Sequence, residues 1–215
     1  TGVRLAEATL PFTPQGKRVS VVPYGVDLDR FRPAARAERS PLVVGAVSRL
    51  SPEKGFDVLL RAIAALRDRG TALDVLFAGD GPSRAMLERL TAELRLTEHV
   101  RFAGEVAHAD VPAVLQQIDI FAMPSTWEGF GVSAIEASAM ELPVVASNIH
   151  GIPDVVVHGD TGLLVPPSAP PALADAIARP ADDARPITVA AVGDTVMGSL
   201  PYGLPPDDGA SVFSE

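Results

Sequence analysis

Short apolar runs rich in β-branched residues alternate with segments of helical periodicity along most of the chain. Runs of this kind, bounded by Gly, Pro or polar residues, are typical of strands that are buried on both faces of a sheet. We therefore predict strands at residues 42–47, 73–79, 100–104, 119–124, 143–147 and 162–165.

Helical patterns fill the intervals between these runs. Apolar residues recur every three or four positions from Phe56 to Leu66, and Gly70 follows where a helix C-terminus favours glycine. Pro82 is suited to the opening of a second helix, and Asp110 to the N-cap of a third. Two more helices are predicted over residues 133–140 and 171–178.

The repeated strand–helix alternation predicts an α/β fold, a doubly wound parallel Rossmann-like sheet of about six strands. The expected strand order is 3-2-1-4-5-6. In such sheets ligands bind beyond the carboxyl ends of the strands, at the point between strands one and four where the winding reverses. The loops at residues 48–55 and 124–131 follow these two strands, so we expect them to flank a binding site.

The pattern also suggests how the chain is divided. Residues 1–40 are expected to be the remnant of an N-terminal domain plus an interdomain connection, and residues 41–178 a complete Rossmann-like domain. Charge and proline over residues 179–186 indicate a linker. Residues 187–215 form a tail that begins with a new apolar run. We favour a loosely attached tail over the alternative, the truncated start of a second domain.

Composition narrows the classes of function. The formal net charge of −9 argues against broad nucleic-acid binding, which depends on clustered Lys and Arg. No uncharged apolar run approaches the roughly 20 residues that cross a bilayer, and the first residues lack a signal-peptide pattern. The chain has no cysteine, and its four histidines lack metal-ligand spacing, so they are interpreted as ordinary surface or loop residues. The absence of disulfides and of a thiolate metal site suits a cytoplasmic protein.

The loop after the first strand offers two basic side chains, Arg49 and Lys54, and then Gly55 at the start of a helix. A forked guanidinium and a compact ammonium suit a diphosphate, and the N–H groups at a helix start add to the attraction. The alternative is that both side chains are solvated surface residues. Spacing alone favours that alternative, and only the position of the loop at the winding reversal makes the two interpretations about equal.

Two acids follow the fourth strand: Glu128 in the loop, and Glu136 on the helix expected over residues 133–140. A carboxylate at Glu136 could accept hydrogen bonds from two vicinal hydroxyls such as those of a ribose. The alternatives are an acid that complements a helix dipole for Glu128 and a solvated helix residue for Glu136. Against the latter, the neighbours of Glu136 are apolar, and a buried acid would need a hydrogen-bond partner.

Between the two acids, the backbone is suited to close approach by an anion. Gly129 and Gly131 lack side chains, and Val132 and Ser133 present N–H groups at the expected start of a helix. We interpret Trp127, just before this stretch, as a packing residue of the loop.

Five motifs in order resemble a known family: VVPYGVDLDRF, VSRLSPEKG, AGDGP, VRFAGEV and EGFGVSAIEASAMELPVVAS followed by GIPDVVVHGDTGLLVPP. Together, over roughly residues 19–178, they are similar to the carboxyl-terminal, donor-binding half of a GT-B glycosyltransferase of family 4. The resemblance implies a retaining transferase that takes a nucleotide-diphosphate sugar and, usually, no metal. No cofactor is expected, since the nucleotide-sugar is a substrate.

The resemblance also implies roles for individual residues. Arg49 and Lys54 match the basic pair that grips the diphosphate, and Glu136 matches the acid that binds the ribose hydroxyls. Glu128 matches the donor-sugar contact and, with Arg49 and Lys54, is assigned to the catalytic group. The remaining donor-binding positions are Gly129, Phe130, Gly131, Val132, Ser133 and Gly79, together with Glu105 and Val106, whose backbone would meet the nucleobase.

The sequence departs from the family pattern in three places. Glu141 stands where the family usually has a glycine, which requires that this turn avoid positive φ. Of the family's acceptor-binding N-terminal domain, we expect only the last fragment in this sequence, so that domain or a partner subunit would have to supply the rest. The tail around ITVAAVGDTVMGS is similar to the opening strand of poly-γ-glutamate capsule-synthesis proteins, which resemble metallophosphoesterases, and Asp194 would there be a metal ligand.

The resemblance predicts a chain that supplies the donor half of glycosyl transfer, in surface polysaccharide or glycoconjugate synthesis. Two alternatives stay open: a nucleotide-sugar-binding module without activity of its own, and another GT-B enzyme such as a sugar-nucleotide epimerase. Peripheral association with the inner face of the membrane through the missing half is a further expectation. Self-association through apolar surface near residues 1–25 and the crevice is another.

Overall fold

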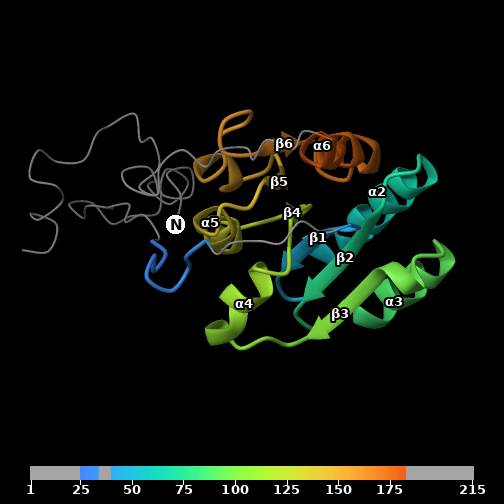
Figure 1. The fold of residues 1–215 in the computed structure, drawn as a ribbon, viewed down its shortest axis with the longest axis horizontal. Coiled ribbons are helices and arrows are strands. Elements are labelled where there is room, and N and C mark those ends of the chain that lie inside the picture. The colour runs from blue at the N-terminus through green and yellow to red at the C-terminus, as the bar shows by residue number, and fades with distance from the viewer. Residues whose placement is uncertain (1–24, 34–39, 183–215) are drawn as a thin grey trace, which may run out of the picture.

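The computed structural model describes residues 25–33 and 40–182 of the 215-residue chain. Six strands form one parallel sheet in the order β3-β2-β1-β4-β5-β6, which confirms the predicted topology (Figure 1). The strands are β1 Leu42–Val47, β2 Leu73–Ala78, β3 Val100–Gly104, β4 Ile120–Met123, β5 Val144–Ser147 and β6 Leu163–Val165.

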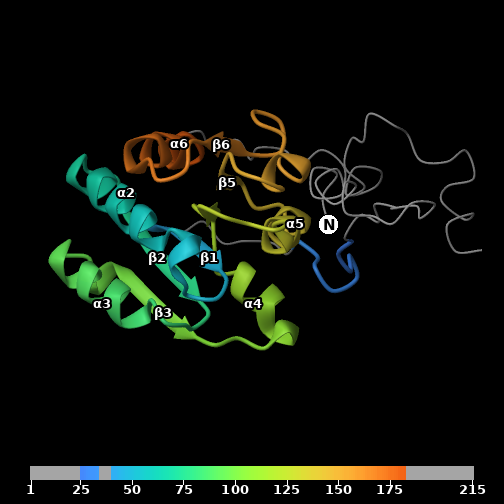
Figure 2. The ribbon, with the colours of Figure 1, turned by 180° about the vertical axis from the view of Figure 1, so that it is seen from behind.

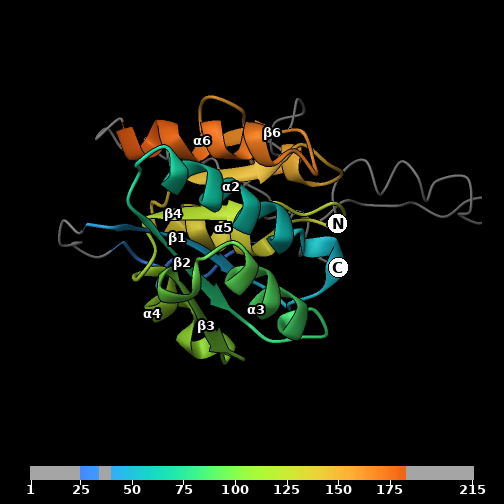
Figure 3. The ribbon, with the colours of Figure 1, turned by 90° about the vertical axis from the view of Figure 1, so that its right-hand side faces the viewer.

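Helices cover both faces of the sheet, as its buried strands require. The α-helices are α2 Phe56–Asp68, α3 Arg84–Glu93, α4 Val111–Leu115, α5 Val132–Ala139 and α6 Pro170–Asp182. Short 3-10 helices are η2 Pro52–Lys54, η3 Thr97–His99, η4 His108–Asp110 and η5 Ile152–Asp154. Figure 3 shows α6, α2 and α3 in front of the sheet, with α4 and α5 behind it.

The two faces of the sheet correspond to two apolar clusters. The larger cluster packs α2, α3 and α6 against the sheet, and the rings of Phe56, Phe77 and Phe102 follow one another in it at centroid distances of 5.0 and 5.3 Å. The second joins α4 and α5 to the opposite face and includes Phe31 from the segment at residues 25–33. That segment lies beside α5 (Figure 2), so it is part of the folded domain.

The end of α5 corrects one expectation from the sequence. Glu141 has φ +55, in the left-handed region, although we expected this turn to avoid positive φ. The Glu141 N–H donates to Ser138 O at 2.9 Å, and the Leu142 N–H donates to Ala137 O at 3.0 Å. These two bonds form a Schellman motif, which satisfies the last carbonyls of the helix and holds a glutamate where glycine is preferred.

Two other boundaries differ from the prediction. Helix α6 continues through Asp182, so the first four residues of the expected linker at 179–186 are helical. Helix α3 begins at Arg84, because Pro82 and Ser83 form the turn that precedes it. Most of the expected N-terminal remnant, the rest of the linker and the tail with Asp194 lie outside the described residues, as does the apolar surface expected near residues 1–25.

Candidate functional site

The carboxyl ends of β1 and β4 lie side by side at the point where the winding reverses. Val44 pairs with Ile120 and Gly45 with Phe121. A small pocket opens at these ends, between the two loops that the sequence singled out. It is lined by Ala46, Val47, Ser48, Lys54, Phe56, Phe121, Ala122, Met123, Ser125, Glu128 and Ser133. The expected location of the site thus coincides with a pocket that contains three of the predicted site residues.

Direct contacts join the two loops. The Thr126 N–H donates to Glu53 O at 2.8 Å, and the Thr126 hydroxyl donates to the same oxygen at 3.2 Å. Gly55 has φ +64, and a Cβ there would lie 2.2 Å from Pro124 O. Only glycine therefore allows this approach, and the loops are held together before any ligand binds.

Lys54 and Glu128 form an ion pair across the pocket. The Lys54 Nζ lies 2.6 Å from Glu128 Oε2, with side chains 17% and 16% exposed. Glu128 Oε1 also accepts the Gly129 N–H at 3.1 Å. The structure therefore brings these two predicted residues together in a largely enclosed position. The interpretation of Lys54 as a solvated surface residue is wrong.

Arg49 differs from Lys54 in two respects: the Arg49 side chain is exposed, and Arg49 makes no ion pair within the described ranges. It lies near Glu53, whose pKa is lowered mainly by the Ser51 hydroxyl, which donates to Glu53 Oε1 at 2.5 Å. Lys54 and Arg49 lower this pKa further through their charges. The loop after β1 therefore carries an exposed guanidinium without an ion pair in the described ranges.

Helix α5 begins at the pocket with free backbone donors. Its N-cap Gly131 has φ +87, and a Cβ there would lie 2.8 Å from Ile152 Cδ1. No acceptor in the described part of the chain receives the N–H groups of Val132 and Ser133. A Cβ on Gly129 would meet open space. This helix start can therefore donate to an anion, as the sequence predicted for Val132 and Ser133.

Glu136 is buried, with a side chain 8% exposed, so a solvated position on the helix is excluded. Its Oε1 lies 3.0 Å from His108 Nε2. His108 was interpreted from the sequence as an ordinary surface or loop residue; it does lie at the surface, with a side chain 67% exposed, but its contact with Glu136 was not foreseen. The contact joins positions 28 residues apart, and no local pattern in the sequence indicates it.

The remaining predicted positions lie around the pocket without lining it. A Cβ on Gly79 would lie 1.9 Å from Ser48 O, so glycine is required there for packing between the β1 and β2 loops. Glu105 is exposed and Val106 half-buried, both directly after β3. Phe130 is half-buried in the turn before α5. These residues share the carboxyl edge of the sheet with the pocket.

A family model described as "Glycosyl transferases group 1" matches residues 28–186, most of the chain. The chain belongs to this family. Its sheet order and its five motifs agree with that assignment. The likeness of the tail to capsule-synthesis proteins falls beyond residue 186, outside the match, and stays a prediction.

Curated relatives of the chain are named glycosyltransferases. One is the GDP-mannose-dependent α-(1-6)-phosphatidylinositol monomannoside mannosyltransferase of Mycobacterium tuberculosis, 37% identical over 217 residues, covering 88% of this chain and 56% of the relative. Another is the D-inositol 3-phosphate glycosyltransferase of Nocardia farcinica, 43% identical over 164 residues and covering 69% of this chain and 36% of the relative. The chain thus spans about half, or less, of the length of these relatives.

Solved structures of similar fold include two with more than a quarter of residues identical. The Anabaena protein Alr3699/HepE, solved in complex with UDP, is 29% identical with a TM-score of 0.67, over 77% of this chain and 49% of that one. Sucrose-phosphate synthase from Thermosynechococcus elongatus is 31% identical with a TM-score of 0.75, over 85% of this chain and 49% of that one. Both likenesses cover more than three quarters of this chain.

No group of three or more His, Asp or Glu side chains is arranged to hold a metal ion within residues 25–33 and 40–182. No helix in the same ranges is long and apolar enough to span a bilayer.

Trp127, which we had interpreted as a packing residue, is instead 63% exposed beside the pocket, so that interpretation is wrong.

Proposed function

We propose that this chain binds a nucleoside-diphosphate sugar and supplies the donor half of a retaining glycosyl transfer. One observation carries the proposal: Lys54 and Ser133, the latter at the start of α5, line one pocket where β1 and β4 end, and Arg49 lies exposed in the loop that follows β1. A diphosphate is the ligand class that such a set of donors suits.

The diphosphate would interact with donors of two kinds. The N–H groups of Val132 and Ser133 have no other acceptor within the described chain, and Arg49 is unpaired there. Lys54 is now paired with Glu128, and a bound diphosphate would share its ammonium. As the bond from the anomeric carbon to the diphosphate breaks, negative charge grows on the departing oxygen. Removing a donor aimed at such charge typically lowers turnover about 100-fold or more.

The two acids would bind the two sugars of the donor. Glu136 is buried and accepts one hydrogen bond, from His108, so its carboxylate can accept the vicinal hydroxyls of a ribose. Glu128 lies in the pocket wall between Lys54 and the Gly129 N–H, on the side where the transferred sugar would lie. The backbone after β3, at Glu105 and Val106, would face the base. This arrangement uses no metal, because basic side chains and helix N–H groups supply the positive charge.

Features of the relatives support this reading without selecting a base or a sugar. The Anabaena neighbour was solved with UDP and with UDP and glucose, whereas the mycobacterial relative is named for GDP-mannose. Several relatives are named for glycosylation of inositol phospholipids or inositol phosphate, which favours a glycoconjugate product. Because this chain covers about half of their length, we propose that the acceptor is bound by the half that these relatives have in addition.

The test is a thermal-shift series with nucleoside diphosphates and their sugars. The parent chain is compared with the Arg49→Ala, Lys54→Ala double variant and with a matched control, Arg61→Ala, Arg89→Ala. The control removes two exposed arginines from α2 and α3, so it changes the net charge equally. A ligand at ~100 times its Kd adds roughly 2.7 kcal/mol to the free energy of unfolding.

We expect one base series to stabilise the parent and the control but not the pocket variant. Equal stabilisation of all three proteins, or none at millimolar ligand, would overturn the proposal. Binding without transfer when the chain is combined with an acceptor-binding half would favour the alternative of a nucleotide-sugar-binding module. Retention is tested in the same assay by the anomeric proton of the product in a ¹H NMR spectrum.

A further inference from the structure

The buried carboxylate of Glu136 has one hydrogen-bond partner within residues 25–33 and 40–182. That partner is the His108 ring, whose Nε2 lies 3.0 Å from Glu136 Oε1. The two side chains differ sharply in exposure, since Glu136 is 8% exposed and His108 is 67% exposed. A carboxylate with so little access to water is oriented mainly by the few hydrogen bonds that it makes with the protein. His108 is therefore well placed to decide how this carboxylate points.

Arg30 determines which nitrogen of His108 carries the proton. An Arg30 guanidinium nitrogen, Nη1, lies 3.0 Å from His108 Nδ1. Arginine can only donate, so Nδ1 must accept, and the ring proton is then on Nε2. The Nε2–H group consequently donates to Glu136. The other guanidinium nitrogen, Nη2, donates to the backbone carbonyl of His108, so Arg30 contacts both the ring and the backbone of this residue.

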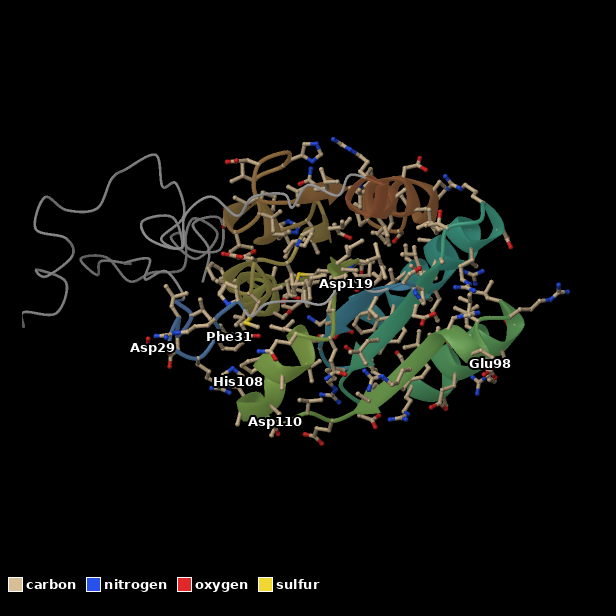
Figure 4. The ribbon with its side chains drawn as sticks, viewed as in Figure 1. Asp29, Phe31, Glu98, His108, Asp110 and Asp119 are labelled. Carbon is tan, nitrogen blue, oxygen red and sulfur yellow. The ribbon has the colours of Figure 1, made fainter. Side chains whose placement is uncertain are left out.

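The segment that carries Arg30 is itself anchored. Phe31 is 2% exposed within the cluster formed with α4 and α5, and its ring centroid lies 6.1 Å from that of His108. Figure 4 shows Phe31 and His108 next to each other. The Asp27 carboxylate accepts the N–H groups of Asp29 and Arg30, which shapes the turn. Arg30 is thus held next to His108 by a segment that packs against the domain.

We propose that His108 is a positioning residue that orients the Glu136 carboxylate to accept two vicinal ribose hydroxyls, and that Arg30 holds the required tautomer. The proposal rests on the proposed function, because it names how that site recognises its ligand. One oxygen of the carboxylate is fixed by His108, and the other is left with no partner in the described chain. A neutral Nε2–H donor turns the carboxylate without cancelling the charge that attracts hydroxyl donors.

The proposal also connects two parts of the sequence. Arg30 lies 78 residues before His108, in the segment that leads into the domain, and His108 lies 28 residues before Glu136. Ribose recognition is thereby linked to the correct docking of residues 25–33. A substitution in that segment would weaken nucleotide binding although it touches no ligand.

The test uses UDP and GDP, each beside its 2′,3′-dideoxy counterpart, which lacks both ribose hydroxyls. Isothermal titration is performed on the parent, His108→Ala, His108→Gln, Arg30→Gln and a control, His158→Ala. The control removes another exposed imidazole, one that accepts the Leu164 N–H beside β6. We expect His108→Ala to lower the affinity for the ribonucleotide about tenfold, which corresponds to ~1.4 kcal/mol. The affinity for the dideoxy ligand should change less than about twofold, and the amide donor of His108→Gln should restore most of the loss.

Equal losses for ribonucleotide and dideoxynucleotide would overturn the proposal, since the effect would then not pass through the hydroxyls. So would unchanged binding in His108→Ala. If the parent binds neither UDP nor GDP, the proposed function fails instead, and this result is recognisable because it needs no variant.

A measurement without ligand covers the case in which a variant folds poorly. Long-range ¹H–¹⁵N NMR of the parent distinguishes the protonated from the bare ring nitrogen of each histidine, and His108→Gln assigns the His108 signal. We expect a protonated Nε2 and a bare Nδ1, with the mixture of tautomers returning in Arg30→Gln. Protonation of Nδ1 in the parent would contradict the tautomer on which the proposal depends.

Discussion

The sheet has one edge at the amino ends of its parallel strands, the amino edge, and one at their carboxyl ends, the carboxyl edge. These two edges use charged side chains in opposite ways. At the amino edge, the Asp119 carboxylate accepts the Val43 N–H at 2.8 Å, while the Asp119 N–H donates to Val43 O at the same distance. Nearby on this edge, Arg67 donates to Leu73 O at 2.7 Å and to the ring of His99, whose other nitrogen lies 2.9 Å from Asp74. Polar groups here satisfy one another.

At the carboxyl edge the donors and acceptors are only partly matched. Arg49 and the first N–H groups of α5 have no acceptor in the described chain, and Glu136 has a single donor, His108. Figure 4 marks the two edges by Glu98, in η3, and His108, in η4. Polar groups that hydrogen-bond to one another stabilise a fold. Polar groups that are held in place without a protein partner are available to bind a ligand. The comparison assigns stability to one edge and binding to the other.

The largest predicted effect is a loss of stability when a hydrogen bond at the amino edge is removed. Asp119→Ala removes the acceptor of the Val43 N–H, so it should lower the free energy of unfolding by about 2 kcal/mol. Urea unfolding measures this change, and isothermal titration should show nucleotide affinity unaltered. Asp119→Asn, which keeps an acceptor oxygen, should recover part of the loss. If Asp119→Ala weakened nucleotide binding instead, the division between the edges would be incorrect.

The next prediction contrasts two glycines at the carboxyl edge, one needed for stability and the other for binding. Gly131→Ala must accommodate φ +87 and a contact of 2.8 Å with Ile152, so we expect it to lower stability by about 1–2 kcal/mol. Gly129→Ala meets open space and should leave stability within about 0.5 kcal/mol while weakening binding of the nucleotide-sugar. Thermal unfolding with and without ligand distinguishes the two. A Gly129→Ala protein that binds as well as the parent would remove residue 129 from the site.

A smaller effect is a gain at the amino edge. Glu141 holds φ +55 at the end of α5, and glycine adopts this conformation without strain. Glu141→Gly should therefore raise the free energy of unfolding by about 0.5–1 kcal/mol, with no change in binding. Chemical denaturation is the measurement, and Ser138→Gly, inside the same helix, serves as a control that should lower stability. A loss of stability in Glu141→Gly would mean that the glutamate is held by contacts stronger than its strain.

The smallest predicted effect is on pH dependence at the carboxyl edge. The Ser51 hydroxyl lowers the pKa of Glu53 below its usual 4.5, so the folded state binds this proton less tightly than the unfolded state. The resulting stability is present above pH 4.5 and is lost as the pH falls through the folded pKa. In Ser51→Ala, the decline of stability below pH 4.5 should be shallower and Glu53 should titrate at higher pH in an NMR experiment. An unchanged Glu53 titration would exclude the hydroxyl as the cause.

The sheet could be predicted from the sequence because each buried strand and each helix leaves a local pattern. Residues 42–47 and 100–104 are strands with the predicted limits, and the strand order follows from the alternation of elements. The pocket could be placed because loops at a winding reversal are fixed by that order. Lys54 and Glu128 were both found in this way, although their ion pair joins positions 74 residues apart and left no signal of its own.

The missed features depend on tertiary contacts or on backbone geometry. His108 meets Arg30 and Glu136 only because η4, α5 and the segment at residues 25–33 pack together. Trp127 is apolar but exposed, since its loop is held by Thr126 and Glu53 rather than by its ring. Residue type alone argued against positive φ at Glu141, and the hydrogen bonds that close the helix prevailed.

The central claim is that the carboxyl edge at β1 and β4 binds a nucleoside diphosphate. Its most direct test is a ¹H–¹⁵N NMR titration of the chain with UDP, GDP and their sugars. The account predicts the largest amide shifts at Lys54, Val132 and Ser133, with Val43 and Asp119 unmoved. Shifts concentrated at the amino edge, or no shifts with any of these ligands at millimolar concentration, would contradict it.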